Sequence, residues 1–158
     1  MSTKIKIQGK RVRETTLEHI RRVNSMLIVC ANVLLRKAIN HDSTKLEEPE
    51  VGIFEKFGNA FRDVPYGSPE YYRITNLPEF QEAVKHHHKH NPHHVEFFKE
   101  GALGMDLFDI IEMVCDWKAA CERNPGGLLE YHIKVNFERF NIPVDLQKVI
   151  LNTLKTLK

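Results

Sequence analysis

The chain has 158 residues, of which 42% are hydrophobic and 28% charged, and its formal net charge is +2. This length suits one globular domain of ordinary size, no apolar run approaches the ~18 residues of a membrane span, and a nucleic-acid-binding protein usually has a larger basic excess. The sequence also lacks a secretory signal, so we expect a cytoplasmic protein with reduced thiols at Cys30, Cys115 and Cys121.

Helices are predicted along almost the whole chain. Residues 1–15 include the alternating segment KIKIQ, which predicts a short extended arm. A long helix is predicted from Thr16 to about His41, because apolar residues recur there at spacings of three and four without an intervening Pro or Gly. These apolar residues are Leu17, Ile20, Val23, Leu27, Cys30, Ala31, Leu34 and Ala38.

Shorter helices follow, and proline marks several of their ends. Pro49, Ser68-Pro69 and Leu77-Pro78 are typical of helix starts, and Asn91-Pro92 ends the helix that begins at Pro78. Further helices are predicted over residues 93–100, 106–122, 127–140 and 144–157. We therefore predict an all-α fold, with six to eight helices in a single compact domain over residues 16–158.

Six histidines lie within nine positions of the internal stretch VKHHHKHNPHHVEFF, residues 84–98. Continuing the apolar face of the predicted helix leads to His87 and then His90, which are expected to point into the interior. His86 and His88 are expected at the surface.

The turn at Asn91-Pro92 can bring His93 or His94 back toward His87. Neutral imidazole is the commonest ligand of transition metals, and a buried pair of histidines has few other partners. We therefore predict metal binding by His87 and by at least one of His93 and His94.

Three carboxylates recur on one face of the helix predicted over residues 106–122. Asp109, Glu112 and Asp116 are spaced i, i+3, i+7, and apolar residues flank them on both sides. Burial of like charges requires compensation, which a cation would provide. The alternative is a solvated acidic stripe paired with lysines of a neighbouring helix.

His41 and Asp42 form a His-Asp dipeptide near the end of the long helix, with Lys45 shortly after it. An adjacent imidazole and carboxylate can bind one divalent cation, and the carboxylate can bridge to a second. His19 precedes His41 by 22 residues. In an unbroken helix the two lie about 33 Å apart and cannot share an ion.

Several blocks together resemble a family of small uncharacterised proteins of bacteria and their phages. The blocks are HDSTK, PE at positions 49 and 50, YGSPEYY, HHHKHNPHHVE and IEMVCDWKA. They are also similar to blocks of the HD superfamily of metal-dependent phosphohydrolases, which are all-helical. The resemblance implies metal ligation by His41, Asp42 and Asp116, and by His87 with His93 or His94. The first histidine of the HD pattern has no good match, since His19 is too far along the helix.

The leading hypothesis is a phosphohydrolase acting on a nucleotide or a related small phosphoester. One or two divalent ions (Mn, Fe, Zn, Co or Ni) would be its cofactor. We expect Lys45, and secondarily Arg123, to bind phosphate. We expect Glu112 to act as general base or to hold a metal ligand.

Two other functions stay open. The same cluster could be a structural metal site in a protein without catalysis. Alternatively, the segment KIKIQGKRVR and the basic residues of the long helix could bind a nucleic acid or a protein. A homodimer is also compatible with the sequence.

Overall fold

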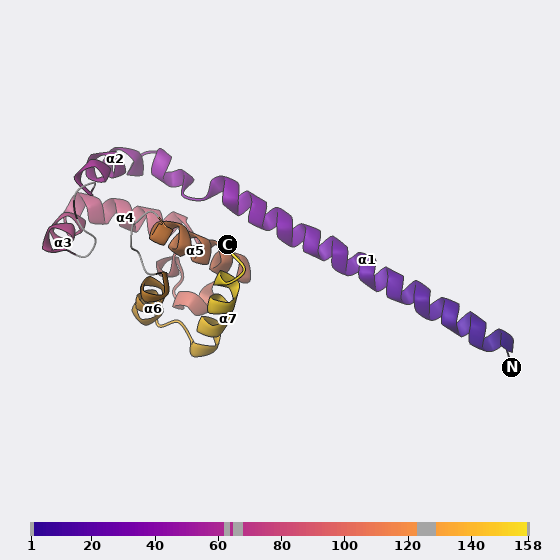
Figure 1. The fold of residues 1–158 in the computed structure, drawn as a ribbon. Coiled ribbons are helices and arrows are strands. Elements are labelled where there is room, and N and C mark those ends of the chain that lie inside the picture. Colours follow the sequence, from indigo (N-terminus) through magenta and orange to yellow (C-terminus); the bar gives the residue numbers. More distant parts are fainter. Residues whose placement is uncertain (1, 62–63, 65–67, 123–128, 158) are drawn as a thin grey trace. The chain divides into compact units, whose positions relative to one another are not determined.

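The computed structural model describes residues 2–61, 64, 68–122 and 129–157, with side chains from Val12 onward. These residues form seven α-helices and three short 3₁₀ helices, and none of them lies in a strand, which confirms the all-α prediction (Figure 1). No described helix has a stretch long and apolar enough to cross a bilayer. The elements are α1 (Ser2–Asn40), η1 (Ser43–Leu46), α2 (Glu50–Phe61), α3 (Pro69–Thr75), α4 (Pro78–His90), η2 (Val95–Phe97), η3 (Gly101–Gly104), α5 (Leu107–Glu122), α6 (Leu129–Arg139) and α7 (Val144–Leu154).

The extended arm expected for residues 1–15 is wrong for residues 2–15, which belong to α1. A short alternating segment gains stability as a strand only beside another strand, and the described chain contains none. No proline lies between Ser2 and Asn40, so nothing in the sequence forces the helix to begin later.

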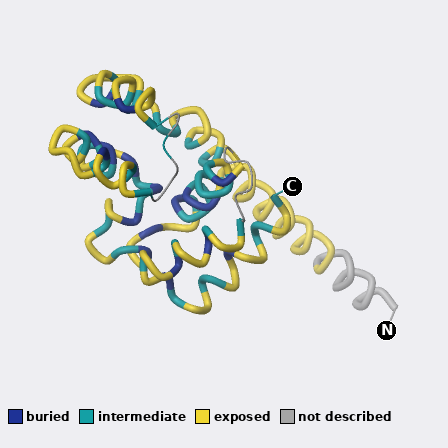
Figure 2. Tube along the Cα trace, turned by 60° about the vertical axis from the view of Figure 1, so that its left-hand side comes forward, coloured by how far each residue is buried: buried dark blue, intermediate teal, exposed yellow. Residues whose placement is uncertain are grey.

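Contacts between residues divide the chain into two units, residues 1–39 and residues 40–158. The first unit is a single helix whose described apolar side chains are mostly exposed (Figure 2). The second unit contains η1 and all elements from α2 to α7, and every buried residue among those whose side chains are described belongs to it. Every residue of the candidate site described below also lies in this second unit.

Aromatic side chains hold α2 against α4. The ring of Phe80 in α4 makes edge contacts with three rings of α2, at centroid distances of 6.1 Å to Phe54, 5.3 Å to Phe57 and 5.5 Å to Phe61. The predicted helix starts are confirmed nearby, since the Ser68 hydroxyl accepts a hydrogen bond from the Tyr71 backbone N–H and α4 begins at Pro78. This packing brings the start of α2 close to the last turns of α4.

A second core joins α5, α6 and α7 to the two short helices η2 and η3. Its buried residues are Val95, Ala102, Met105, Met113, Val114, Ile133, Phe137, Ile142 and Ile150. The start of α5 is fixed by Asp106, whose carboxylate accepts hydrogen bonds from the backbone N–H groups of Phe108 and Asp109, both at 2.8 Å. One face of α5 therefore packs on this core.

Candidate metal centre

The structure brings together the turn after α1, the end of α4, the turn after Pro92 and the middle of α5. Among the described residues, nitrogen and carboxylate oxygen atoms form four overlapping groups, in each of which all ligand atoms lie within 4.8 Å of one another. Three of them share Asp42, His41 or His93: Asp42 with His87, His93 and His94; His41 with His93 and Glu112; and His41 with Asp42 and Asp116. The fourth, His88 with His94 and Glu96, contains the exposed Glu96.

Asp42 is common to two of these groups, and its backbone explains its position. Its φ of 55° is left-handed, a conformation that Asp tolerates better than most residues other than Gly. The turn ends α1 and starts η1, where the Lys45 N–H donates to the Asp42 carbonyl oxygen at 2.9 Å. It leaves the side chains of the consecutive residues His41 and Asp42 facing one another, with Nε2 of His41 3.7 Å from Oδ2 of Asp42.

Glu50 holds His87 in a defined orientation. The Glu50 side chain has 0% exposure, and its Oε2 lies 2.9 Å from Nδ1 of His87. Since an ionised carboxylate only accepts hydrogen bonds, Nδ1 carries the proton and donates it. In the neutral ring, the other nitrogen, Nε2, then has a free lone pair.

Glu112 orients two further histidines through their Nδ1 atoms. Its Oε1 lies 2.9 Å from Nδ1 of His41 and 3.3 Å from Nδ1 of His93. Because both contacts engage Nδ1, the Nε2 atoms of His41 and His93 are left to face the interior of the cluster.

The Nε2 atoms of all three rings lie around the Asp42 carboxylate. Oδ1 of Asp42 is 3.2 Å from Nε2 of His87 and 3.3 Å from Nε2 of His93, and Oδ2 faces His41. Around a tetrahedral ion with bonds of about 2.0–2.1 Å, neighbouring ligand atoms lie about 3.3–3.4 Å apart. The separations of Oδ1 from His87 and His93 fit such an ion, whereas the His41 ring lies farther from the carboxylate.

Two buried atoms of the cluster have no hydrogen-bond partner among the described residues. They are Oδ1 of Asp42 and Nε2 of His93, which face each other. A buried polar atom without a partner is costly, and a cation between a carboxylate oxygen and an imidazole lone pair would satisfy both.

The charges of the cluster also favour a cation. Burial lowers the pKa of His93, but the carboxylates of Asp42 and Glu112 outweigh this effect and raise it to about 9. Burial likewise raises the pKa of Asp42, yet the neighbouring rings of His87 and His93 and the ammonium group of Lys45 bring it well below its ordinary value. The Asp42 carboxylate therefore stays ionised and attracts positive charge.

His94 has the opposite surroundings. Burial, followed by the nearby charges of His93, His88 and His87, lowers its pKa to about 2. Its ring is therefore neutral and able to ligate, and its Nε2 lies 2.9 Å from Nε2 of His87.

Lys45 and Asp116 lie on the more exposed side of the cluster. Nζ of Lys45 donates to Oδ2 of Asp42 at 2.5 Å, and Oδ1 of Asp116 is 3.8 Å from Nε2 of His41. The exposed fractions of these two side chains are 38% and 27%. Both side chains are therefore partly in contact with solvent.

Some expected positions differ from the observed ones. His90 is exposed and bonds back to the His86 carbonyl oxygen, so its predicted inward orientation is wrong. The His90 ring lies against that of the partly exposed His86, at a centroid distance of 4.1 Å, in the last turn of α4. His86, expected at the surface, is only partly exposed and its Nδ1 contacts Oε1 of Glu50 at 2.7 Å.

Asp109 is buried, but its carboxylate accepts from the Asp106 backbone N–H at the start of α5 and belongs to none of the ligand groups. Only Glu112 and Asp116 of the predicted acidic face reach the centre. His19 is exposed in the first unit, and Arg123 lies outside the described residues.

Three residues of the site, Glu50, Thr44 and Asn91, were not predicted from the sequence. Glu50 looks like an ordinary acidic residue in a first helical turn, although it stands in the PE block of the family resemblance. Thr44 donates to Glu50 at 3.0 Å and accepts from Asn91 at 2.9 Å, and Asn91 also donates to the His87 carbonyl oxygen at 2.8 Å. Glu50 and Asn91 are buried and Thr44 is partly buried, and no pattern in the sequence marks them as such.

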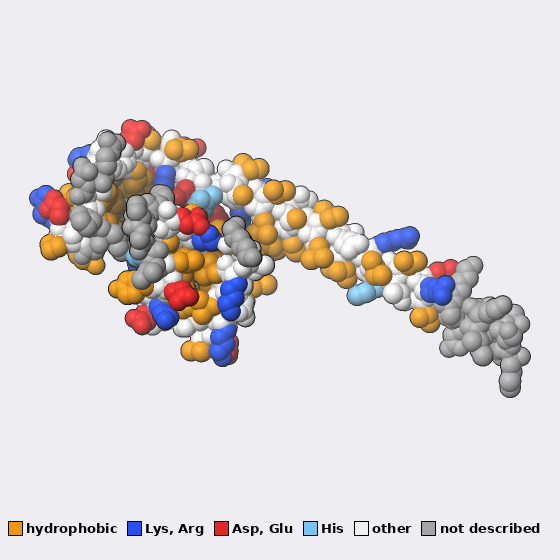
Figure 3. Space-filling view, viewed as in Figure 1, with side chains coloured by type: hydrophobic (Ala, Val, Ile, Leu, Met, Phe, Trp, Pro, Cys, Tyr) orange, Lys and Arg blue, Asp and Glu red, His pale blue; other side chains and the backbone are white. Residues whose placement is uncertain are grey.

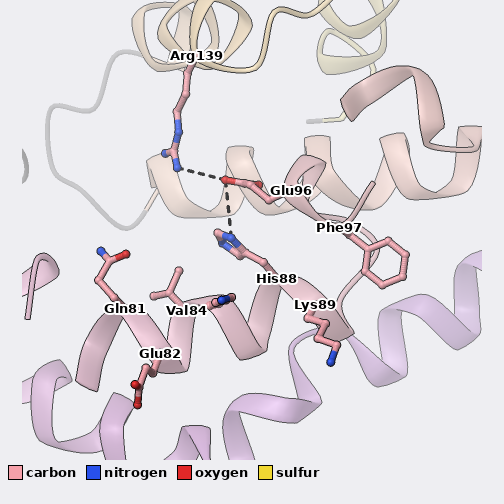
Figure 4. Close-up of a pocket in the computed structure, with 9 residues that line it drawn as sticks. Gln81, Glu82, Val84, His88, Lys89, Glu96, Phe97 and Arg139 are labelled. Carbon is pink, nitrogen blue, oxygen red and sulfur yellow. Dashed lines mark hydrogen bonds and ion pairs between the residues drawn. The ribbon is translucent and has the colours of Figure 1, made fainter. Parts of the chain in front are cut away.

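A cavity of about 760 Å³ lies beside the histidines, between α4, η2 and α6. Its lining includes Val84, His88, Phe97 and Arg139, and a chain of contacts runs from Arg139 through Glu96 to His88 (Figure 4). The residues around Asp42 are not among its lining, so this cavity is distinct from the centre.

Comparison with known proteins gives one finding. Residues 8–157 match a family of unknown function, DUF5662. No curated protein and no solved structure matches the chain. The expected membership of an uncharacterised family is confirmed, and nothing in these comparisons links the chain to the HD superfamily.

Proposed function

The chain belongs to the DUF5662 family, whose function is unknown, and we propose from its own site that it is a metal-dependent phosphohydrolase. The substrate class we propose is a nucleotide or a related small phosphoester.

The observation that carries the proposal is the shared orientation of three histidines. His41, His87 and His93 each turn Nδ1 toward a carboxylate of Glu50 or Glu112 and Nε2 toward Asp42. Histidines that bind metals usually donate their other ring N–H to a carboxylate or a carbonyl group, which fixes the ring and its tautomer. The partnerless atoms of Asp42 and His93 support a cation at the same place.

The ligand groups can hold one or two ions. Asp42, His87, His93 and His94 would hold the buried ion, and His41, Asp42 and Asp116 would hold one closer to solvent, with Asp42 common to both groups. Mixed imidazole and carboxylate ligands suit Mn, Fe, Co, Ni or Zn. Such an ion supplies Lewis acidity toward a phosphoryl oxygen and lowers the pKa of water.

The residues of the exposed side would act on the substrate. Lys45 carries an ammonium group beside Asp42, where it would neutralise phosphate charge. Of the two roles open to Glu112, we assign it the positioning of His41 and His93, because its Oε1 contacts both rings. The resemblance of the sequence motifs to those of the HD superfamily supports the same activity.

One observation favours a structural metal instead. The group of Asp42, His87, His93 and His94 has four ligands and is mostly buried, and closed four-ligand sites are typical of structural zinc. The two functions differ at the other group, which has three ligands and therefore leaves a coordination position for water or substrate.

The first test is elemental analysis of the purified protein, followed by phosphate release from nucleoside mono-, di- and triphosphates with added Mn²⁺ or Fe²⁺. We expect bound metal and phosphate release by the parent, and loss of both in Asp42→Ala. A parent without metal, whose stability and phosphate release do not respond to Mn²⁺, Fe²⁺ or Zn²⁺, would contradict the proposal.

A second test uses Lys45→Ala. We expect turnover to fall by about 100-fold or more, while metal content and melting temperature stay close to those of the parent, because a half-exposed ion pair adds little stability. Lys56→Ala is the matched control, since Lys56 also pairs with a carboxylate, that of Glu79 at 2.6 Å. Loss of metal from Lys45→Ala would contradict the phosphate-binding role.

A further inference from the structure

We propose that α1 is a dimerisation helix, whose apolar face packs against the same face in a second copy of this chain. The inference is independent of the metal centre and of the proposed activity.

The first observation is the exposure of α1. Hydrophobic side chains line the surface of its described part (Figure 3). Among the large ones, Ile20 is 46% and Leu27 is 61% exposed. An amphipathic helix is normally stabilised by burying its apolar face rather than by its intrinsic propensity. The first unit is a single helix, which cannot bury its apolar face within itself, so this face requires a partner surface.

The second observation is the spacing of the apolar residues. Ile20, Val23, Leu27, Cys30 and Leu34 follow one another at alternating intervals of three and four. This alternation places a narrow apolar seam along the helix, which is the pattern that pairs with an equivalent helix. The same helix in a second copy of the chain has the same seam, so the two apolar seams can pack against each other.

The third observation concerns charge. Residues 23–35, VNSMLIVCANVLL, contain no charged side chain. Two copies of a protein with a net positive charge would repel each other if basic residues lined the seam. The central part of α1 avoids this repulsion, and it also offers nothing to an acidic partner such as a nucleic acid.

The apolar face runs along most of the described part of α1. Seven of the exposed apolar residues lie on the same half of the helix: Val12, Leu17, Ile20, Val23, Leu27, Ile28 and Leu35. Specific interfaces begin at about 1,000 Å² of total buried area. The pairing therefore has to use the whole length of this face rather than a single turn.

The test is the mass of the full chain in solution, measured by light scattering after gel filtration at several concentrations. We expect the parent to have twice the mass of one chain. Leu27→Glu should weaken the dimer by roughly 100-fold or more, because the new carboxylate would have to be buried without a partner. The helical signal of the parent should also melt at a temperature that rises with protein concentration.

Asn32→Glu is the matched control, because it adds the same charge to an exposed residue on the polar face of α1. It should leave the mass at that of a dimer. A monomeric parent, or a dimer that survives Leu27→Glu, would overturn the inference, and so would dissociation by both variants to the same extent. Metal content serves as a separate readout, because a folded Leu27→Glu variant should retain the metal centre even when it is monomeric.

Discussion

At the scale of single residues, the centre depends on groups that touch histidines rather than on the histidines alone. His87 has one nitrogen on Glu50 and the other near Asp42, at 2.9 Å and 3.2 Å. Glu50 is itself held by Thr44 and His86. Burial would raise the pKa of Glu50, but hydrogen bonds from these neighbours lower it, so that it remains an acceptor.

Glu50→Gln should therefore weaken metal binding by about 10- to 100-fold, because the amide no longer fixes His87 as a carboxylate does. The measurement is titration of the metal-free protein with Mn²⁺ or Zn²⁺. Glu55→Gln, an exposed position on the same helix, should bind like the parent. If Glu50→Gln binds the metal as tightly as the parent does, Glu50 does not contribute to the metal site.

The pKa of His93 predicts opposite effects of pH on stability and on metal binding. Since this pKa is raised from 6.5 to about 9, its contribution to the stability of the metal-free protein is fully present below pH 6.5. The contribution is lost as the pH rises through about 9. We expect a loss of about 1–3 kcal/mol in the free energy of unfolding over this range.

Metal affinity should rise over the same range, because a cation must displace the proton of His93. Urea unfolding and metal titration between pH 6 and 9 measure the two trends. His93→Gln should abolish the stability trend, whereas His19→Gln, an exposed histidine of α1, should keep it. A metal-free protein that grows more stable toward pH 9 would contradict the prediction.

At the scale of elements, the centre is assembled by the packing of α2 against α4. Glu50 belongs to the first turn of α2 and His87 to the last turn of α4. The edge contacts of Phe80 with Phe57 and its neighbours hold these helices together, and Phe54 also lies 6.0 Å from the His87 ring. The aromatic cluster therefore adjoins the candidate metal centre through Phe54.

Phe57→Ala should lower the free energy of unfolding by about 3–5 kcal/mol, since a nearly fully buried ring is replaced by a cavity. Metal affinity should fall in the same variant, because α2 and α4 no longer hold Glu50 against His87. Phe57→Leu keeps most of the volume and should cost less than about 2 kcal/mol. Denaturant unfolding measures the first effect and metal titration the second. If Phe57→Ala is destabilised but binds metal with unchanged affinity, the packing of α2 on α4 is not needed to hold the centre.

At the scale of the whole molecule, the second unit has a hydrophobic core that can stabilise its fold without a bound metal. The second unit has a core of its own in η2, η3 and α5–α7, with Met113, Ile133 and Ile150 almost completely buried. This core lies apart from the aromatic cluster of α2 and α4. We therefore expect the fold to survive without metal.

Removal of metal by a chelator should leave the helical circular dichroism spectrum in place and lower the melting temperature. Saturation at 100 times the dissociation constant contributes about 2.7 kcal/mol. Asp116→Ala should weaken metal binding, and its metal-free form should be at least as stable as the metal-free parent, because one charge of an acidic cluster is gone. Unfolding of the parent on chelation would indicate a structural metal instead.

Much of the fold could be read from local patterns. The spacing of apolar residues, Ser68 as a cap and the prolines at 69 and 78 act over one or two turns, and the observed helices begin where these signals stand. The candidate metal ligands could also be chosen from the sequence, because the ability to bind a metal is a property of each residue type. They are His41, Asp42, His87, His93, His94 and Asp116.

The sequence by itself determined the all-α class, the helix ends marked by Pro and Ser, and the residue types able to bind a metal, because these follow from interactions between near neighbours. Only the tertiary structure decided that Glu50, Thr44 and Asn91 support His87, that Asp109 caps α5 and that His90 faces solvent. Those outcomes depend on burial and on contacts between residues as far apart as His41 and Glu112. No local pattern records such contacts, because they exist only once α2, α4 and α5 have packed.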